Sequence, residues 1–287
     1  MSERIAVIGA GTMGSGIAQL SAQAGHAVSL VDVSTDRLDQ ALASIRRSAT
    51  KLHQKGRLAD DADAVLSRIQ TAASTAGALP HADEVTLALE AVPEDPDLKR
   101  ALLADLARAL PADALIATNT SGLPIGELAE GLPHPERVLG LHFFNPPVLM
   151  RVVEVVRGPA TSDAAFERAV AFVRGLDRDP VRVQRDLPGF VLNRIAMAAS
   201  NEAIRLVELG VATPEEVDRG VKGAFGWKMG PLETADLVGL DVVYHARMQI
   251  FERTGDARFK PPGLVKTLVD AGKLGRKTGS GFYHYED

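Results

Sequence analysis

The chain has 287 residues, of which 32 are basic and 37 acidic, so its formal net charge is −5, and it has no cysteine. The length favours two domains of about 100–200 residues, the acidic balance opposes general binding to nucleic acid, and the lack of cysteine excludes disulfides and thiolate metal sites. No apolar run reaches the roughly 18 residues needed to cross a bilayer, so we expect no membrane partner, no metal and a cytoplasmic location.

The first predicted elements are a strand, a helix and a second strand. Arg4–Ile8 is typical of a buried strand, and Met13–Ala24 predicts a helix of small residues. His26–Val31 predicts the next strand. The turn after the first strand, Gly9-Ala10-Gly11-Thr12-Met13-Gly14, has the G-x-G-x-x-G spacing, which permits a tight turn and a close backbone approach to a pyrophosphate. This context predicts a dinucleotide site.

Asp32, at the end of the second strand, indicates which dinucleotide binds. A carboxylate there accepts hydrogen bonds from ribose hydroxyls and repels a 2′-phosphate, which favours NAD over NADP. Arg37 keeps the NADP alternative open. The alternative without a cofactor is a glycine-rich turn followed by an acidic helix cap.

Further apolar runs alternate with helical stretches along the first two thirds of the chain. Val85–Ala91, Leu115–Thr118 and Val138–Leu141 predict strands, and Leu98–Leu110 predicts one of the helices between them. This alternation is typical of an α/β fold with a doubly wound, Rossmann-type sheet.

The pattern changes to helices alone after Arg185-Asp186-Leu187-Pro188-Gly189, beginning with Phe190–Leu209. We therefore predict a dinucleotide-binding domain at 1–186 and a smaller all-helical domain at 187–287. In the second domain, Thr213-Pro214-Glu215-Glu216 predicts a capping box. Asp241 is expected to cap the helix that follows it, and Gly272–Gly281 predicts a loop.

His142 and Glu154 are the candidate acid–base pair. His142 ends an apolar strand before Asn145-Pro146-Pro147, and ligands bind at the carboxyl ends of strands in doubly wound folds. Histidine is suited to exchange a hydroxyl proton near neutral pH. If the prolines reverse the chain, Glu154, central in the apolar run Arg151–Val156, returns beside His142 and orients its ring. The alternatives are a structural histidine and a glutamate on the wet face of an edge strand.

Other polar residues leave two interpretations open. Asn119-Thr120-Ser121 follows a predicted strand and either binds a substrate oxygen or caps a turn. Asn193, in the first turns of the helical domain, lies either on the surface or toward a cleft. Three basic residues recur every four positions: Arg47, Lys51 and Lys55. They form either a solvated helix face or a binding site for a phosphate-bearing substrate.

Together these motifs resemble the short L-3-hydroxyacyl-CoA dehydrogenases, particularly the bacterial 3-hydroxybutyryl-CoA dehydrogenases. The similarity covers nearly the whole chain and rests on several blocks in the same order. These blocks are Gly9–Gly16, Glu90-Ala91-Val92, Asn119-Thr120-Ser121, His142–Pro146, Glu154-Val155, Pro188–Arg194, Met229-Gly230-Pro231 and Lys277–Tyr283.

The resemblance implies an NAD-dependent oxidation of an acyl-CoA substrate. It implies that His142 is the general base and Glu154 its partner, while Ser121 and Asn193 position the reacting oxygen and the histidine. It also implies further ligand contacts: with NAD for Glu90, Lys99, Asn145 and Lys277, and with the CoA moiety for Lys51 and Ser44. Family members pair through the helical region, which predicts a homodimer.

Two departures from the family keep other functions open. Gly122 stands where a second serine is usual, and Pro147 follows the Asn-Pro pair. A double proline is also found in dehydrogenases of small polar hydroxy acids such as L-gulonate, or of carnitine, although those generally have proline where this chain has Phe143. A non-catalytic NAD-binding sensor is the alternative of another class.

Overall fold

The computed structural model describes residues 2–285 and divides the chain into two compact units, 1–190 and 191–287. The division falls between Phe190 and Val191, whereas the sequence placed it after Asp186. Phe190 belongs to the first unit because its buried side chain joins the apolar core there. It also has a left-handed backbone, with φ of 48°, which keeps it outside the helix that begins at Leu192.

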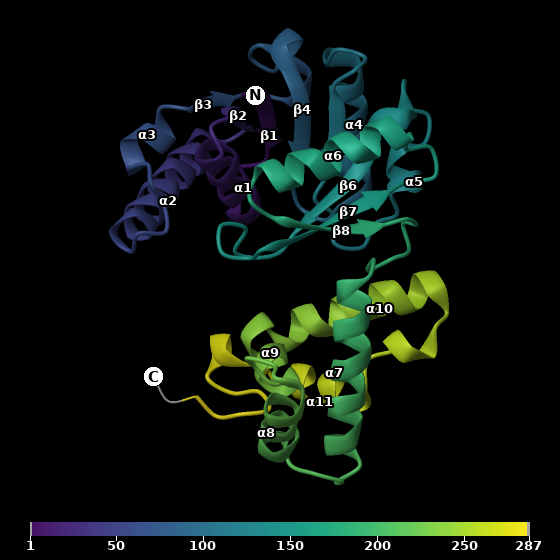
Figure 1. The fold of residues 1–287 in the computed structure, drawn as a ribbon. Helices are drawn as coiled ribbons and strands as arrows, with labels where there is room; N and C mark the ends of the chain where they lie inside the picture. The colour runs from purple at the N-terminus through teal and green to yellow at the C-terminus, as the bar shows by residue number, and fades with distance from the viewer. Residues whose placement is uncertain (1, 286–287) are drawn as a thin grey trace. The chain divides into compact units, whose positions relative to one another are not determined.

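The first unit is built on one sheet of eight strands in the order β3-β2-β1-β4-β5-β6-β7-β8 (Figure 1). Every neighbouring pair is parallel except β6 with β7. The doubly wound sheet is therefore confirmed, with two edge strands, β3 and β8, that the sequence did not indicate. The strands are β1 (Arg4–Ile8), β2 (Ala27–Asp32), β3 (Ile69–Ala73), β4 (Val85–Glu90), β5 (Leu115–Thr118), β6 (Val138–Phe143), β7 (Val152–Arg157) and β8 (Asp179–Val183).

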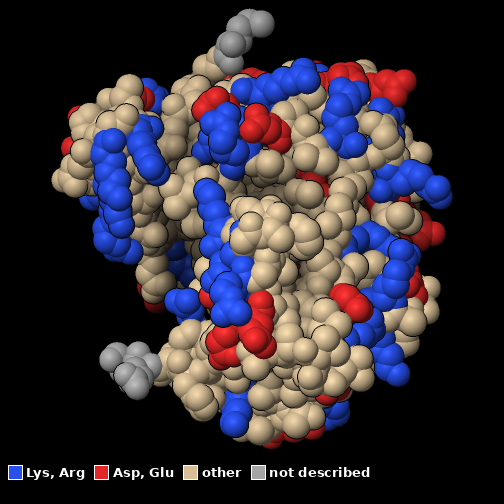
Figure 2. Space-filling view, turned by 60° about the horizontal axis from the view of Figure 1, so that its bottom comes forward, with Lys and Arg blue, Asp and Glu red and all other residues tan. Residues whose placement is uncertain are grey.

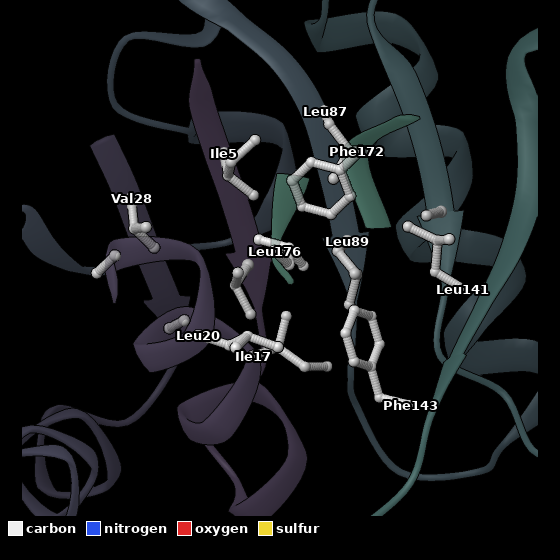
Figure 3. Close-up of a cluster of buried hydrophobic side chains, with 14 of the residues drawn as sticks. Ile5, Ile17, Leu20, Val28, Leu87, Leu89, Leu141, Phe143, Phe172 and Leu176 are labelled. Atoms are coloured by element: carbon white, nitrogen blue, oxygen red, sulfur yellow. The ribbon is translucent and has the colours of Figure 1, made fainter. Parts of the chain in front are cut away.

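Helices cover both faces of this sheet. They are α1 (Thr12–Gln23), α2 (Thr35–Gln54), α3 (Ala62–Leu66), α4 (Pro96–Ala109), α5 (Ile125–Ala129) and α6 (Asp163–Gly175), with short 3-10 turns at Ala76–Ala78, Ala82–Glu84 and Pro135–Arg137. Alternate residues of β1 enter opposite cores: Ile5 packs with α1 and α6, and Ala6 packs with α4. Figure 3 shows the first core, in which Ile17 of α1 and Phe172 of α6 lie among side chains of the sheet such as Ile5 and Leu89.

The second unit is all-helical, as predicted. Its helices are α7 (Leu192–Glu208), α8 (Pro214–Phe225), α9 (Pro231–Val238), α10 (Leu240–Thr254) and α11 (Gly263–Asp270), with 3-10 turns at Ala257–Phe259 and Arg276–Thr278. The capping box before α8 is confirmed, because Thr213 and Glu216 exchange side-chain to backbone hydrogen bonds of 3.3 and 3.1 Å. The predicted cap at Asp241 is wrong: Gly239 caps α10, and Asp241 lies inside its first turn.

The carboxyl-terminal loop is fixed by a buried acid. Asp236 of α9 accepts hydrogen bonds from the backbone nitrogens of Phe282 and Tyr283, both at 3.0 Å, and from the hydroxyl of Tyr285. Burial raises the pKa of Tyr285 to about 12. A Cβ added at Gly281 would lie 2.2 Å from a carboxylate oxygen of Asp236, so only glycine fits there. The predicted loop at Gly272–Gly281 is thus largely irregular but firmly attached to α9.

Two general features of the described residues bear on partners. Within residues 2–285, no helix combines the length and the apolar character needed to span a membrane. On the face shown in Figure 2, basic side chains are separated by acidic and uncharged ones.

Candidate active site

The predicted pairing of His142 with Glu154 is confirmed geometrically. The two residues are direct partners in the antiparallel register of β6 and β7, so the chain does reverse at the Asn-Pro-Pro turn. His142 Nδ1 lies 2.8 Å from Glu154 Oε2, and the two residues are 4% and 0% exposed. A carboxylate at Nδ1 favours the tautomer with its proton on that nitrogen, which leaves Nε2 as the proton acceptor.

Two phenylalanines hold the imidazole ring from its sides. The ring centroid of His142 lies 4.6 Å from that of Phe144 and 5.7 Å from that of Phe190. These contacts and the Glu154 hydrogen bond limit rotation about both side-chain torsions. The arrangement can hold Nε2 in one position and accept a proton from a bound hydroxyl without reorganising.

The glycine loop has the geometry that its motif predicts. A Cβ at Gly9 would lie 2.6 Å from the Ala91 carbonyl oxygen, and one at Gly14 would lie 1.8 Å from the Gly9 oxygen. These two glycines are required by packing. At Gly11 an added Cβ would meet no atom within 4 Å. Open space at that position fits the close approach of a pyrophosphate to the backbone.

Asp32 is held beside the glycine loop by backbone hydrogen bonds. Its carboxylate accepts hydrogen bonds from the backbone nitrogens of Ala10 at 2.9 Å and Ser34 at 3.0 Å, which fix it beside the loop. It lines a pocket of about 670 Å³ together with Thr12, Met13 and apolar residues of α4. A partly apolar pocket beside the glycine loop, with Asp32 and Arg37 in its lining, suits the adenosine half of a dinucleotide.

Glu90, at the end of β4, and Lys99, in α4, form a second buried ion pair. Lys99 is 1% exposed, and its Nζ lies 2.7 Å from Glu90 Oε1 and 3.2 Å from Glu94 Oε2. Glu90 also accepts hydrogen bonds from the Thr118 hydroxyl at 2.6 Å and the Val92 nitrogen at 2.7 Å. Lys99 is thus not a solvated lysine, and the charged atoms of the pair are directed at one another. Their contact with NAD stays a prediction.

Glu94 contacts two of the predicted site residues, Lys99 and Ser121, and the sequence analysis did not single it out. Its Oε1 accepts hydrogen bonds from the Thr120 hydroxyl at 2.5 Å and the Ser121 backbone nitrogen at 3.0 Å. Its side chain is 36% exposed, unlike the fully buried Glu90. Glu94 therefore links Lys99 to the predicted Ser121 loop and still presents an edge to solvent. The Glu-x-x-x-Glu spacing after a strand is the only local signal for it.

The Asn119-Thr120-Ser121 turn has a structural use beside any role in binding. Asn119 Oδ1 accepts a hydrogen bond of 2.9 Å from the backbone nitrogen of Phe143, next to His142. Thr120 Oγ1 accepts from the backbone nitrogen of Leu123 at 2.9 Å. The turn is therefore capped as one interpretation predicted, and it ties the end of β5 to the end of β6 close to the histidine.

The remaining predicted residues lie in separate places. Asn145 is exposed and lines a pocket of about 400 Å³ with Ser44 and the glycine loop. Lys51 is exposed on α2 and does not line that pocket. Asn193 and Lys277 belong to the helical unit, where Lys277 Nζ binds Asp241 at 2.6 and 2.7 Å. Among residues 2–285, no group of three or more His, Asp or Glu side chains is arranged to hold a metal ion.

Comparison with known proteins accounts for this arrangement. The family model described as "3-hydroxyacyl-CoA dehydrogenase, NAD binding domain" matches residues 4–187, and that described as "3-hydroxyacyl-CoA dehydrogenase, C-terminal domain" matches residues 189–285. The chain is 40% identical to a 3-hydroxybutyryl-CoA dehydrogenase of Bradyrhizobium diazoefficiens, over 99% of this chain and 95% of that protein.

Two further proteins are similar over their whole length. A probable 3-hydroxybutyryl-CoA dehydrogenase of Deinococcus radiodurans is 39% identical over 98% of this chain and 100% of its own. The crystal structure of an (S)-3-hydroxybutyryl-CoA dehydrogenase from Ralstonia eutropha superposes with a TM-score of 0.93, at 35% identity and with full coverage of both chains. The chain therefore belongs to the 3-hydroxyacyl-CoA dehydrogenase family.

Proposed function

We propose that the chain oxidises an L-3-hydroxyacyl-CoA to the 3-ketoacyl-CoA with NAD, and catalyses the reverse reaction, on short acyl chains such as 3-hydroxybutyryl. The observation that carries this proposal is the buried His142–Glu154 pair, 2.8 Å apart at the carboxyl edge of an NAD-type sheet. The family and the names of the relatives support the acyl-CoA substrate.

In the proposed mechanism His142 Nε2 accepts the proton of the 3-hydroxyl as the C3 carbon loses a hydride. NAD held at the glycine loop and Asp32 would supply the acceptor for that hydride. Glu154 keeps the proton on Nδ1 and stabilises the imidazolium that forms. In the reverse direction His142 returns the proton to the ketone oxygen, so one residue is base and acid in turn.

Ser121 and Asn193 are proposed to position the reacting oxygen and the histidine. Support for Ser121 comes from its loop, which Glu94 attaches to the segment after β4 and Asn119 attaches to β6 next to His142. We further propose that Asp32 binds the adenosine ribose of NAD, and that Glu94 presents its exposed edge toward the cofactor, with Lys99 holding it there. Contacts of Asn145 and Lys277 with NAD, and of Glu90 with NAD, stay predictions.

Replacing His142 tests the proposed function. His142→Gln should lower kcat for NADH-linked reduction of acetoacetyl-CoA by about 10²–10⁴ while NADH binding persists. The matched control is His134→Gln, since His134 is an exposed histidine paired only with Glu136. Near-normal turnover in His142→Gln would refute the assignment.

A substrate panel separates the alternatives. The unmodified chain should reduce acetoacetyl-CoA in preference to the oxidation products of carnitine and L-gulonate. Turnover confined to either of those products would make it a dehydrogenase of small polar substrates. NADH binding without turnover of any substrate would indicate a sensor.

We also propose a homodimer formed through the helical unit. Large apolar side chains are exposed there, among them Leu209 at 75% and Phe225 at 72%. Exposed large apolar side chains in this number on a small unit favour an interface that covers them. Light scattering at micromolar concentration should give twice the chain mass of 30.5 kDa, and the mass of a single chain would contradict the proposal. The cytoplasmic location stays a prediction.

A further inference from the structure

The helix that carries Asn193 begins without the usual local signals. Val191 occupies the N-cap of α7, and its apolar side chain cannot accept a hydrogen bond from the first turn. The sequence of that turn, Leu192-Asn193-Arg194-Ile195, contains no acidic residue and places a positive charge at Arg194, which the helix dipole disfavours. The position of Asn193 therefore depends on contacts made elsewhere in the helical unit.

Arg194 is held by the short segment that follows α10. Its guanidinium carbon lies 4.3 Å from the ring centroid of the buried Phe259, and its Nη2 lies 3.8 Å from Asp256 Oδ2. A cation over an aromatic face is attracted by the ring, and more strongly where water is partly excluded. The Arg194 side chain is 20% exposed. Phe259 and Asp256 thus offset the unfavourable place of a positive charge at the start of a helix.

The segment that binds Arg194, residues 256–260, is itself rigid, and we refer to it as the 256–260 turn. Asp256 Oδ1 accepts a hydrogen bond of 3.0 Å from the Arg258 backbone nitrogen, and its Oδ2 pairs with the Arg258 guanidinium at 2.6 Å. These hydrogen bonds lower the pKa of Asp256 to about 2, so its carboxylate stays charged near neutral pH. The turn therefore presents a fixed anion and a fixed ring to Arg194.

Two further residues of α7 attach the helix to the same turn. The side chains of Asn201 and Arg205 donate hydrogen bonds of 2.8 and 3.3 Å to backbone carbonyl oxygens of the 256–260 turn. Arg194, Asn201 and Arg205 lie on one face of α7, because seven and eleven residues are close to two and three helical turns. Asn193 precedes this face by one residue, or about 100° around the helix axis. The turn therefore contacts the face next to that of Asn193.

We propose that the 256–260 turn is a positioning element for the reaction: by binding Arg194 it fixes the first turn of α7, and with it the side chain of Asn193. This inference rests on the proposed function, in which Asn193 positions the reacting oxygen and the histidine. Placement matters because a displacement of about 1 Å in a positioning group can lower turnover about 10²-fold. Rigid contacts outside a site are the means by which such displacement is prevented.

A double-mutant cycle on kcat tests whether Arg194 acts through Asn193. Arg194→Met keeps most of the side-chain length and removes the charge, so kcat for acetoacetyl-CoA reduction should fall about tenfold while the Kd of NADH stays unchanged. Asn193→Ala alone should also lower kcat, and adding Arg194→Met to it should cause no further fall. Equal falls in both backgrounds would overturn the proposal, because a residue that only stabilises the fold acts independently of Asn193. An unchanged kcat in Arg194→Met would overturn it too.

Further variants separate this contact from a general loss of charge or of folding. Arg194→Lys keeps a cation at the Phe259 ring and should retain kcat within about threefold of the parent. Phe259→Leu removes the ring face but keeps an apolar side chain, and it serves for the same cycle with Asn193→Ala if Arg194→Met does not fold. Arg219→Met, at an exposed arginine of α8, is the matched control and should leave kcat unchanged. A fall in that control equal to the fall in Arg194→Met would overturn the proposal.

Hydrogen exchange provides a readout that does not depend on turnover. The amides of residues 195–198, which close the first turn of α7, should exchange about 3–10-fold faster in Arg194→Met, while those of residues 202–208 stay unchanged. Unchanged exchange at 195–198 would overturn the proposal. If exchange responds as expected but the parent chain reduces no acyl-CoA, the proposed function fails while the hold of the turn on α7 stands.

Discussion

Two buried acid–base pairs lie on this sheet, Glu90–Lys99 at the end of β4 and His142–Glu154 on β6 and β7, and they differ in how fully they are satisfied. Lys99 binds Glu90, Glu94 and the Val92 carbonyl oxygen, and Glu90 has donors on both carboxylate oxygens. His142, by contrast, binds Glu154 through Nδ1, and we propose that its Nε2 exchanges a proton with the substrate. A buried charged pair is therefore not in itself a catalytic sign. What distinguishes the catalytic candidate is an atom left open on a rigidly held group.

The largest expected effect comes from changing the His142–Glu154 pair, which we call the open pair because one ring nitrogen of His142 is not used by Glu154. Glu154→Gln preserves size but can donate as well as accept, so it no longer enforces a proton on His142 Nδ1. In the comparable situation of a buried orienting carboxylate, this loss costs up to about 10⁴ in kcat. We expect such a fall for acetoacetyl-CoA reduction, measured by NADH absorbance, with NADH affinity nearly intact. Glu136→Gln is the matched control, because Glu136 pairs with an exposed histidine. A nearly normal kcat in Glu154→Gln would remove the distinction between the two pairs.

Breaking the satisfied pair, Glu90 with Lys99, should first of all lower the stability of the fold. Lys99→Met removes the cation and leaves Glu90 charged and buried, which should lower the free energy of unfolding by about 3–5 kcal/mol. Urea unfolding measures this change, and Lys266→Met, at an exposed lysine paired with Asp270, provides the control. Adding Glu90→Gln to Lys99→Met should recover part of the loss. If Lys99→Met alone were as stable as the parent chain, the Glu90–Lys99 pair would not hold β4 to α4.

The sequence predicted the open pair better than the satisfied one, for a physical reason. His142 and Glu154 interrupt apolar runs on two strands joined by a proline turn, so period-two register alone brings them together. Lys99 looks like an exposed helix residue, and only its tertiary contacts show that it is buried. Glu94 lies in the irregular segment between β4 and α4, where no periodicity exists to read.

The edges of the fold show the same limit. β8 begins Asp179-Pro180 and carries Arg182, so its sequence lacks the apolar run that identified the central strands. It forms because β7 offers a free edge beside it, which is a tertiary cause. The unit boundary moved for a similar reason: Phe190 packs against His142, a contact that no helical pattern records.

A third buried cation lies in the helical unit. It extends the comparison to a cation that no carboxylate contacts. Arg247 of α10 is 4% exposed and donates to the Ser200 hydroxyl at 2.8 Å, while its Nε and Nη1 have no partner among the described residues. Burial lowers its pKa to about 10. Two carboxylates compensate the charge of buried Lys99, whereas little compensates the cost of removing the Arg247 guanidinium from water.

Replacing Arg247 should therefore have the opposite sign from replacing Lys99. Arg247→Met keeps most of the apolar volume and removes the uncompensated charge, so we expect the free energy of unfolding to rise by about 1–2 kcal/mol. Urea unfolding beside the Lys99→Met variant measures both on one scale, and Lys273→Met, at an exposed lysine of the same unit, controls for loss of a positive charge. If Arg247→Met instead destabilises the chain as Lys99→Met does, the guanidinium has a counter-charge that acts on it in solution. The number of carboxylates around a buried cation would then not decide the sign.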